Sequence, residues 1–143
     1  MRYITAGIAT LLVALFVAPA VASAAPWARC NAGDFCLFRG TGGNSGTYHY
    51  SGSDSNLFND RFEVANTDEF VANNTHSAWN NGRSAGSGGY IDVLVSNGPG
   101  GAVGCIQLGR RGNLPEPYAG DIESYRWVTR SQCLSYNQVR LTP

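Results

Sequence analysis

The sequence predicts an all-β sandwich of two Greek-key motifs that is held together by disulfide bonds. Three observations carry this prediction: short runs of alternating polar and apolar residues, glycine-rich turns between them, and four cysteines. Beyond residue 24 no segment keeps a sustained helical periodicity. Many short strands joined by tight turns are typical of sandwiches rather than of helical or α/β folds.

Residues 1–24 have the pattern of a secretory signal peptide. Arg2 precedes the uncharged apolar run 4–17, and Ala22-Ser23-Ala24 gives the small-x-small pattern that a signal peptidase needs. We therefore expect a secreted, extracellular protein. Its mature part, residues 25–143, has the length of one domain and is expected to be a monomer outside the membrane.

All four cysteines lie in this mature part, which in an exported chain indicates two disulfides. Four cysteines allow three pairings. We favour Cys30–Cys36 with Cys105–Cys133, because each bond then ties a strand to its own neighbourhood. Removing Arg2 from ten basic and ten acidic residues leaves a net charge near −1. Without a basic stripe, nucleic acids and anionic membranes have little support as partners.

The expected strands fall into two halves, roughly 30–83 and 88–143. In chain order they are FCLFR (35–39), TYHY (47–50), YIDVLV (90–95), GCIQL (104–108), YRWV (125–128) and NQVRL (137–141). In the third of these, Ile91, Val93 and Val95 share one face. Asp92 falls on the other face, as expected for a half-buried strand.

An internal repeat supports this division into halves. NNTHSAW (73–79) and GDIESYR (120–126) share a serine at the same place, with a bulky residue two positions further on. Trp79 and Trp127 are then interpreted as two core aromatics related by the repeat, and Trp27 as packing over the first disulfide. We interpret 73–82 as a turn, with Asn and Ser side chains capping backbone groups while Trp79 packs inward.

Catalytic constellations have little support. GNSGT (43–47) is similar to the nucleophile loop of chymotrypsin-like proteases, but there the nucleophile comes last, whereas His49 and His76 both follow Ser45. These two histidines lack the spacing of a catalytic zinc site. Carboxylates such as Glu63 lie in a polar stretch, without signs of the burial that a glycosidase acid needs. We therefore expect a protein that is not an enzyme and has no cofactor.

The opening of the mature chain reads CNAGDFCLFRGTGGNSGTYHY (30–50). It resembles the secreted proteinase inhibitors of actinomycetes that are grouped as peptidase inhibitor family I36. The positions in register are Cys30, Gly33, Cys36, Phe38, Gly40, Thr41, Gly42 and Gly46, whereas Asn31 stands where proline is usual. SAWNNG and GPGGAVGCIQL continue the resemblance to about residue 110. The resemblance implies a βγ-crystallin-like sandwich of two Greek-key motifs.

The resemblance also implies inhibition of a secreted proteinase, of the thermolysin type of metalloproteinase, through a rigid exposed loop. In such inhibitors the bond presented to the enzyme lies between a cysteine and a branched apolar residue, and Cys105–Ile106 matches that pair. The expected inhibitory loop comprises Cys105, Ile106, Gln107, Arg110 and Arg111. A disulfide beside this bond would lower the entropy lost on binding. The family's second nearby cysteine is missing here, and the alternative is that Cys105 and Ile106 lie inside a core strand.

A second function is implied by the fold: a βγ-crystallin-like calcium-binding or extracellular structural protein without inhibitory activity. The calcium signature of that fold is similar to Asn/Asp-Asn/Asp-x-x-Ser/Thr-Ser. Asn73, Asn74 and Ser77 fit the first copy. Asp121 and Ser124 fit the second. Because calcium prefers charged oxygen ligands and the first copy offers neutral amides, the expected affinity is low.

Overall fold

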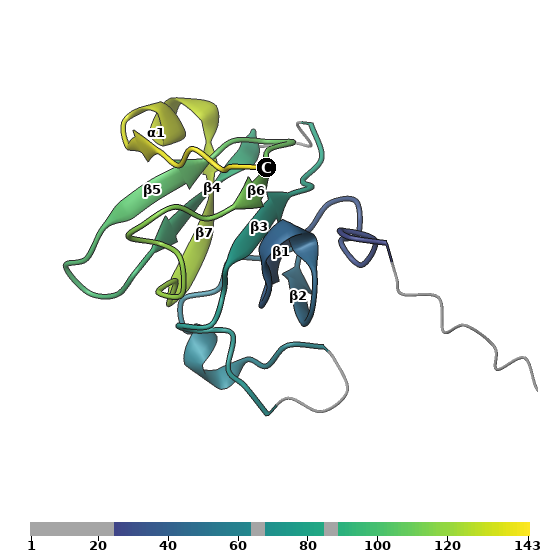
Figure 1. Ribbon diagram of the computed structural model, residues 1–143. Coiled ribbons are helices and arrows are strands. Elements are labelled where there is room, and N and C mark those ends of the chain that lie inside the picture. Colours follow the sequence, from purple (N-terminus) through teal and green to yellow (C-terminus); the bar gives the residue numbers. More distant parts are fainter. Residues whose placement is uncertain (1–24, 64–67, 85–88) are drawn as a thin grey trace, which may run out of the picture.

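The computed structural model describes residues 25–63, 68–84 and 89–143, so the expected signal peptide lies outside the described residues. Two four-stranded sheets face one another (Figure 1). Sheet A has the order β2-β1-β3-β6 and sheet B the order β7-β4-β5-β8. No helix in the described ranges is long and apolar enough to cross a membrane.

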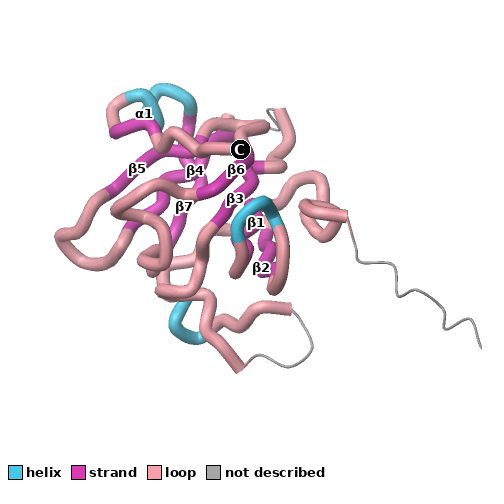
Figure 2. Tube along the Cα trace, viewed as in Figure 1, coloured by secondary structure: helices cyan, strands magenta, loops and turns pink. Residues whose placement is uncertain are grey.

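Most strands are short, and loops connect them over much of the chain (Figure 2). The strands of sheet A are β1 (Phe35–Phe38), β2 (Thr47–Tyr50), β3 (Ser77–Asn80) and β6 (Arg111–Asn113). The strands of sheet B are β4 (Tyr90–Ser96), β5 (Val103–Ile106), β7 (Ser124–Thr129) and β8 (Asn137–Gln138). The helical elements are η1 (Thr41–Gly43), η2 (Leu57–Asn59) and α1 (Arg130–Leu134).

Each sheet takes a segment from the other half of the chain. β6, from the second half, pairs with β3 of the first half. In return Asp54 of the first half forms a bridge with Tyr125 in β7, through N···O distances of 2.9 and 2.7 Å. This exchange interlocks two Greek-key motifs. It confirms the predicted all-β, βγ-crystallin-like sandwich.

The sequence repeat corresponds to an approximate twofold relation between the halves. Asn73 and Gly120 both adopt a left-handed backbone, with φ of 60° and 75°. Asn73 N donates to Ile122 O at 3.1 Å, and Gly120 N donates to Thr75 O at 2.8 Å. Each hydrogen bond is the counterpart of the other. The two loops that lead into β3 and β7 are therefore tied to one another across the sandwich.

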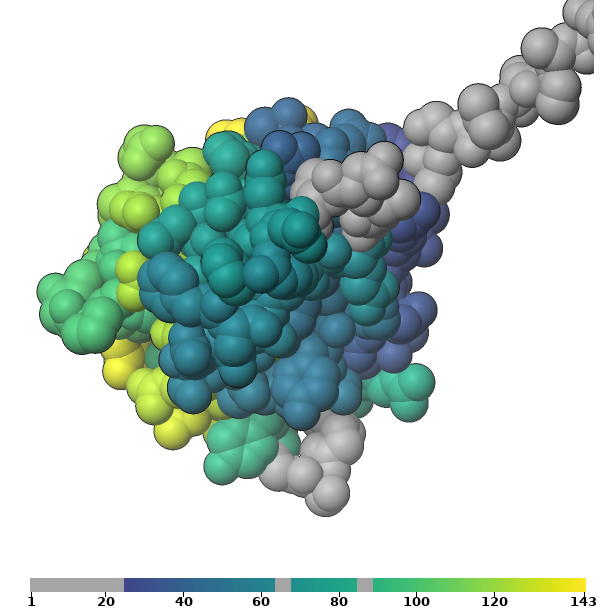
Figure 3. All heavy atoms as spheres, turned by 90° about the horizontal axis from the view of Figure 1, so that it is seen from below, coloured from purple at the N-terminus to yellow at the C-terminus, as the bar shows by residue number. Residues whose placement is uncertain are grey.

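The core lies between the inner faces of the two sheets. Phe35 and Leu37 from sheet A meet Val93, Val95 and Ile106 from sheet B, and all five are fully buried. Burying a side chain of this size stabilises the fold by about 1.5–3 kcal/mol. The segment around η2 closes one end of the sandwich, where it forms much of the surface in Figure 3.

Several local predictions were wrong. The expected turn 73–82 contains β3, which lies between β1 and β6 in the interior of sheet A. Trp79 projects from the outer face of that sheet beside Trp27 and the first disulfide, whereas Trp127 packs against the main core. These two tryptophans are therefore not counterparts. The packing of Trp27 near Cys30–Cys36 was predicted correctly.

The C-terminal part also differs from the prediction. α1 was not expected, because five residues are too few to show helical periodicity. Its one sequence signal is a capping box, in which Thr129 and Gln132 exchange side-chain and backbone hydrogen bonds. Of the expected strand 137–141, only Asn137–Gln138 pairs with β5, in parallel.

Candidate functional site

The two disulfides lie on the outer faces of the two sheets. One joins Cys30 to Cys36 in β1, and the other joins Cys105 in β5 to Cys133 in α1. These are the pairs favoured from the sequence. Cys105 and Cys133 form a small apolar cluster with Leu94 and neighbouring side chains, so the second bond holds α1 against sheet B.

The structure does not place Cys105–Ile106 on an exposed loop, which corrects the expectation for this bond. Both residues lie in β5, opposite Leu94 and Val93 of β4. The Ile106 side chain is fully buried in the main core, and Cys105 is covered by its disulfide. The strand continues to Ile106 because its alternation supplies an inward-facing isoleucine, so the alternative reading, a core strand, holds.

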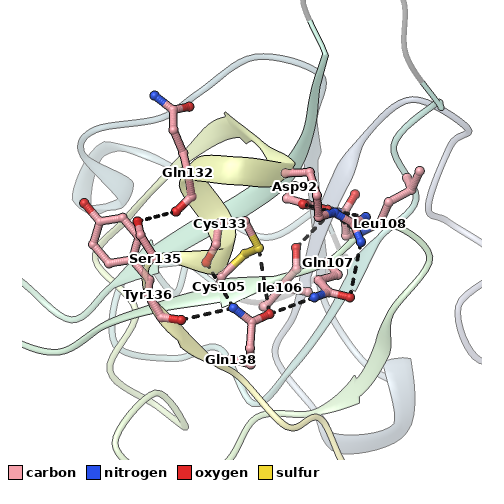
Figure 4. Close-up of a disulfide and its surroundings, with 12 residues drawn as sticks. Asp92, Cys105, Ile106, Gln107, Leu108, Gln132, Cys133, Ser135, Tyr136 and Gln138 are labelled. Carbon is pink, nitrogen blue, oxygen red and sulfur yellow. Dashed lines mark hydrogen bonds and ion pairs between the residues drawn. A yellow bond between two sulfur atoms is a disulfide. The ribbon is translucent and has the colours of Figure 1, made fainter.

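The remaining residues of the expected loop form an exposed turn directly after β5. Arg110 N donates to Gln107 O at 3.1 Å, which closes a β-turn over Gln107–Arg110. Gly109 occupies the third position with φ of 78°, where a type II turn requires glycine. Leu108 at the second position is the turn's one large apolar side chain, and it extends away from the disulfide in Figure 4.

The backbone of this turn is fixed from below by Asn80, the last residue of β3. Asn80 O accepts from Gly109 N at 2.8 Å and Asn80 N donates to Arg110 O at 2.9 Å. The buried Asn80 amide also donates to Ile106 O at 3.1 Å. Two backbone groups of the turn, and the carbonyl of the strand residue just before it, are thus bonded to one residue of sheet A.

A second anchor is Asp92 of β4, whose carboxylate is completely buried beneath the turn (Figure 4). Asp92 Oδ1 accepts from Leu108 N at 2.8 Å and from Arg130 Nη2 at 3.0 Å. Arg130 Nε lies 2.6 Å from Oδ2, close enough for an ion pair but without hydrogen-bond alignment. From the sequence, Asp92 was expected on the exposed face of a half-buried strand. That was wrong, because α1 covers the outer face and Arg130 compensates the charge.

Arg110 and Arg111 both lie at the surface after the turn. The Arg111 guanidinium carbon is 5.2 Å from the Trp79 ring centroid and 5.8 Å from that of Trp27. Such cation–π contacts hold a guanidinium in place while its N–H edges remain available. The structure thus brings Gln107, Arg110 and Arg111 together and leaves Cys105 and Ile106 beneath them.

The residues of the calcium signature lie in the two reciprocal loops. Asn73 and Asp121 are exposed, and Ser124 is half-buried. Ser77 Oγ already donates to Gly40 O at 2.6 Å and accepts from Gly43 N at 3.1 Å. Asn74 donates its amide to two backbone carbonyls of its own loop. Asn74 and Ser77 of the first copy are therefore engaged in structural hydrogen bonds.

Two further clusters carry ionisable groups. Burial, and then the neighbouring Asp54, raise the pKa of Asp60 to about 6. Burial and the hydrogen bond to Asp54, at 2.6 Å, raise the pKa of Tyr48. Elsewhere Asp92 approaches Cys105 and Cys133, but both sulfurs are in a disulfide and cannot act as thiolate ligands. This group is therefore not a metal site.

Part of the chain matches the model of a known protein family. Residues 23–92 match the model of peptidase inhibitor family I36. Over these residues, just under half of the chain, the protein is identified as a member of this family. It is a family of peptidase inhibitors rather than of enzymes, so a peptidase is the partner that membership implies. Neither a curated protein nor a solved structure matches the chain.

The I36 match ends at Asp92, so it covers β1 to β3 and the start of β4, and the turn at Gln107–Arg110 lies beyond it. The sequence did not predict Asn80, Asp92 and Leu108 as parts of the candidate site. Gly109 was the available signal for the turn. No local pattern could assign Asn80 and Asp92 as its anchors, because each contacts the turn only through the fold.

Proposed function

We propose that this protein is a secreted inhibitor of a metalloproteinase of the thermolysin type, which it engages through the turn Gln107–Arg110 and the adjoining Arg111. Membership of family I36 supports the inhibitory activity, and the pattern of residues 1–24 with two disulfides supports secretion. The target class comes from the sequence resemblance. We expect the inhibitor to be a monomer.

The observation that carries the proposal is the rigidity of an exposed turn. Its backbone groups are bonded to two fully buried residues, Asn80 and Asp92, and the Cys105–Cys133 disulfide fixes the strand that precedes it. A segment held in one conformation before binding loses little entropy in the complex. It is also a poor substrate, because the hydrogen bonds that hold it oppose the rearrangement that cleavage requires.

Leu108 is the side chain best suited to an enzyme that prefers a bulky apolar residue after the cleaved bond. It replaces Ile106 in this role, since Ile106 is fully buried whereas Leu108 is partly exposed. The bond presented to the enzyme is then Gln107–Leu108, two residues beyond the bond expected from the sequence.

The test is titration of the oxidised protein into thermolysin, with subtilisin as the serine-protease comparison. We expect stoichiometric loss of thermolysin activity, and an inhibition constant at least about 100-fold weaker for Leu108→Asp, which places a charge in an apolar pocket. Leu134→Asp is the matched control, because Leu134 is an exposed leucine on α1 that is outside the turn.

Three other results would each contradict a different part of the proposal. Unchanged inhibition by Leu108→Asp would remove the turn from the mechanism. Inhibition of subtilisin alone would move the target to serine proteases. Inhibition of neither enzyme would contradict the proposed class.

A further inference from the structure

A groove of about 400 Å³ runs beside the proposed inhibitory turn. It lies between that turn and the C-terminal segment 138–141, and its lining residues are Cys105, Gln107, Arg110, Arg111, Gln138, Val139, Arg140 and Leu141. Three of the eight are arginines and none is a carboxylate. The groove is therefore strongly basic on a chain whose formal net charge is zero.

The positive charge of the groove is not neutralised within the described part of the chain. The arginines found there in ion pairs are Arg39 and Arg130, whose partners are Glu69 and Asp92. Arg110, Arg111 and Arg140 have no carboxylate within ion-pair distance among the described residues. Three arginines that line one hollow without a carboxylate partner favour an anionic occupant.

Contacts within the protein order the side chains that line the groove. Arg111 is held against Trp79 and Trp27, which orders its long side chain before any partner arrives. Gln107 Nε2 donates to Gln138 Oε1 at 3.0 Å and so joins the two walls. An ordered guanidinium with open N–H edges suits bidentate contact with a carboxylate.

The far wall is fixed by the close approach of the C-terminal segment to β6. Val139 N donates to Cys105 O at 2.8 Å, and Thr142 exchanges backbone hydrogen bonds with Asn113. Gly112 permits this approach, because a Cβ there would collide with Thr142 O. The strand next to the turn and the segment that carries Arg140 thus form one rigid unit.

Half of the ten acidic residues lie in one stretch that does not line the groove. The stretch 54–69 holds five carboxylates, and Arg61 is its one basic residue. The chain is therefore electrically polarised, with a basic groove next to the turn. A partner whose surface is acidic near its active site would be steered so that the turn arrives first.

We propose that the groove between the Gln107–Arg110 turn and residues 138–141 docks a carboxylate-rich segment of the target peptidase, beside the active site that the turn enters. This rests on the proposed function for the identity of the partner. The carboxylate recognition itself rests only on the groove, and the two can be tested separately.

The first experiment needs no peptidase. The arginine Nε–Hε NMR signals of the oxidised protein are followed at low ionic strength during addition of the peptide acetyl-Glu-Glu-Glu-Glu-amide. We expect saturable shifts at Arg110, Arg111 and Arg140, and none at Arg126, an exposed arginine on β7. Absence of shifts, equal shifts at Arg126, or tighter binding of the tetranucleotide dT4 would overturn the carboxylate site, whatever the protein inhibits.

The second experiment measures the association rate with the inhibited peptidase at 20 and 200 mM salt. We expect a several-fold fall for the native protein, and a rate about 2–5-fold lower for Arg110→Gln or Arg140→Gln at the lower salt. Arg126→Gln should behave as the native protein does. Unchanged rates in the groove variants would overturn docking on the peptidase. Peptide binding without inhibition of any peptidase would retain the site and refute the proposed function.

Discussion

Replacement of Asp92 by asparagine tests whether a buried charge holds the turn in place. The substitution keeps the shape of the side chain and one oxygen that can accept from Leu108 N. It removes the charge that compensates Arg130, and its amide would turn two donors toward a guanidinium that is also a donor. The change therefore acts on the ion pair and leaves the packing of β4 intact.

The expected loss follows from the contacts of Asp92. A hydrogen bond to a charged group contributes about 1.5–3 kcal/mol, and the asparagine retains roughly 1 kcal/mol of this at Leu108. The Arg130 side chain is 44% exposed and can be hydrated again, which limits the cost of leaving it unpaired. We expect a net loss of about 2 kcal/mol. For a domain of roughly 120 residues this lowers the Tm by about 8 °C.

The assay is thermal unfolding of the oxidised protein, followed by circular dichroism, for Asp92→Asn, Arg130→Gln and the double variant. Arg130→Gln should cost more than Asp92→Asn, about 3 kcal/mol, because it leaves the fully buried carboxylate without its cation. The double variant should be more stable than the sum of the two losses predicts, by about 2 kcal/mol. A Tm within about 2 °C of the native value for Asp92→Asn, or additive losses, would refute the reasoning.

Three further predictions concern other parts of the molecule. Replacing Cys105 and Cys133 by serine should lower the free energy of unfolding by about 3.6 kcal/mol through loop entropy and should weaken inhibition. Replacing Cys30 and Cys36 by serine should lower it by about 2.4 kcal/mol and leave inhibition unchanged. Thermal unfolding and inhibition assays check both results. The pKa of Asp60 is raised from 3.8 to about 6. Its contribution to stability is therefore complete below about pH 3.8 and is lost as the pH rises through 6. In a pH series, the melting temperature of Asp60→Asn should not show the decrease that this loss causes in the native protein. Calcium at 2 mM should raise the Tm by no more than about 3 °C if its dissociation constant is near 1 mM. Asp121→Asn should abolish this rise. A larger rise would favour the calcium-binding function.

The sequence predicted the fold well where alternation was clear. Phe35–Phe38, Thr47–Tyr50 and Val93–Val95 fall in predicted strands, because one face of each had to be apolar. It failed at β3, where Asn and Ser residues suggested a turn. Ser77 and Asn80 are buried there because the Ser77 hydroxyl bonds to backbone groups at η1 and the Asn80 amide donates to backbone carbonyls of β4 and β5. Burial of polar residues through such satisfied bonds has no periodic signature in the sequence.

The candidate site was predicted in part for the same reason. Gln107, Arg110 and Arg111 were assigned to the expected inhibitory loop; both arginines are exposed and Gln107 is half-buried. Ile106 was assigned to the loop because a cysteine followed by a branched apolar residue is an ordinary beginning both for an exposed inhibitory bond and for a core strand. Pairing with β4 decides between the two, and the residues at 105 and 106 do not by themselves reveal that pairing.

The approximate symmetry of the fold shows why the second half carries the candidate site. Pairing makes His49 of β2 the counterpart of Cys105, and Asp54 the counterpart of Gly112. Only residues 51–53 connect the first pair of segments, whereas residues 107–111 connect the second. The longer connection produces the protruding turn, and cysteine in place of histidine adds the disulfide beneath it. A repeat that retains the core in both halves thus leaves one connection available for function, and in this chain the proposed inhibitory turn and the basic groove both lie at that departure from symmetry.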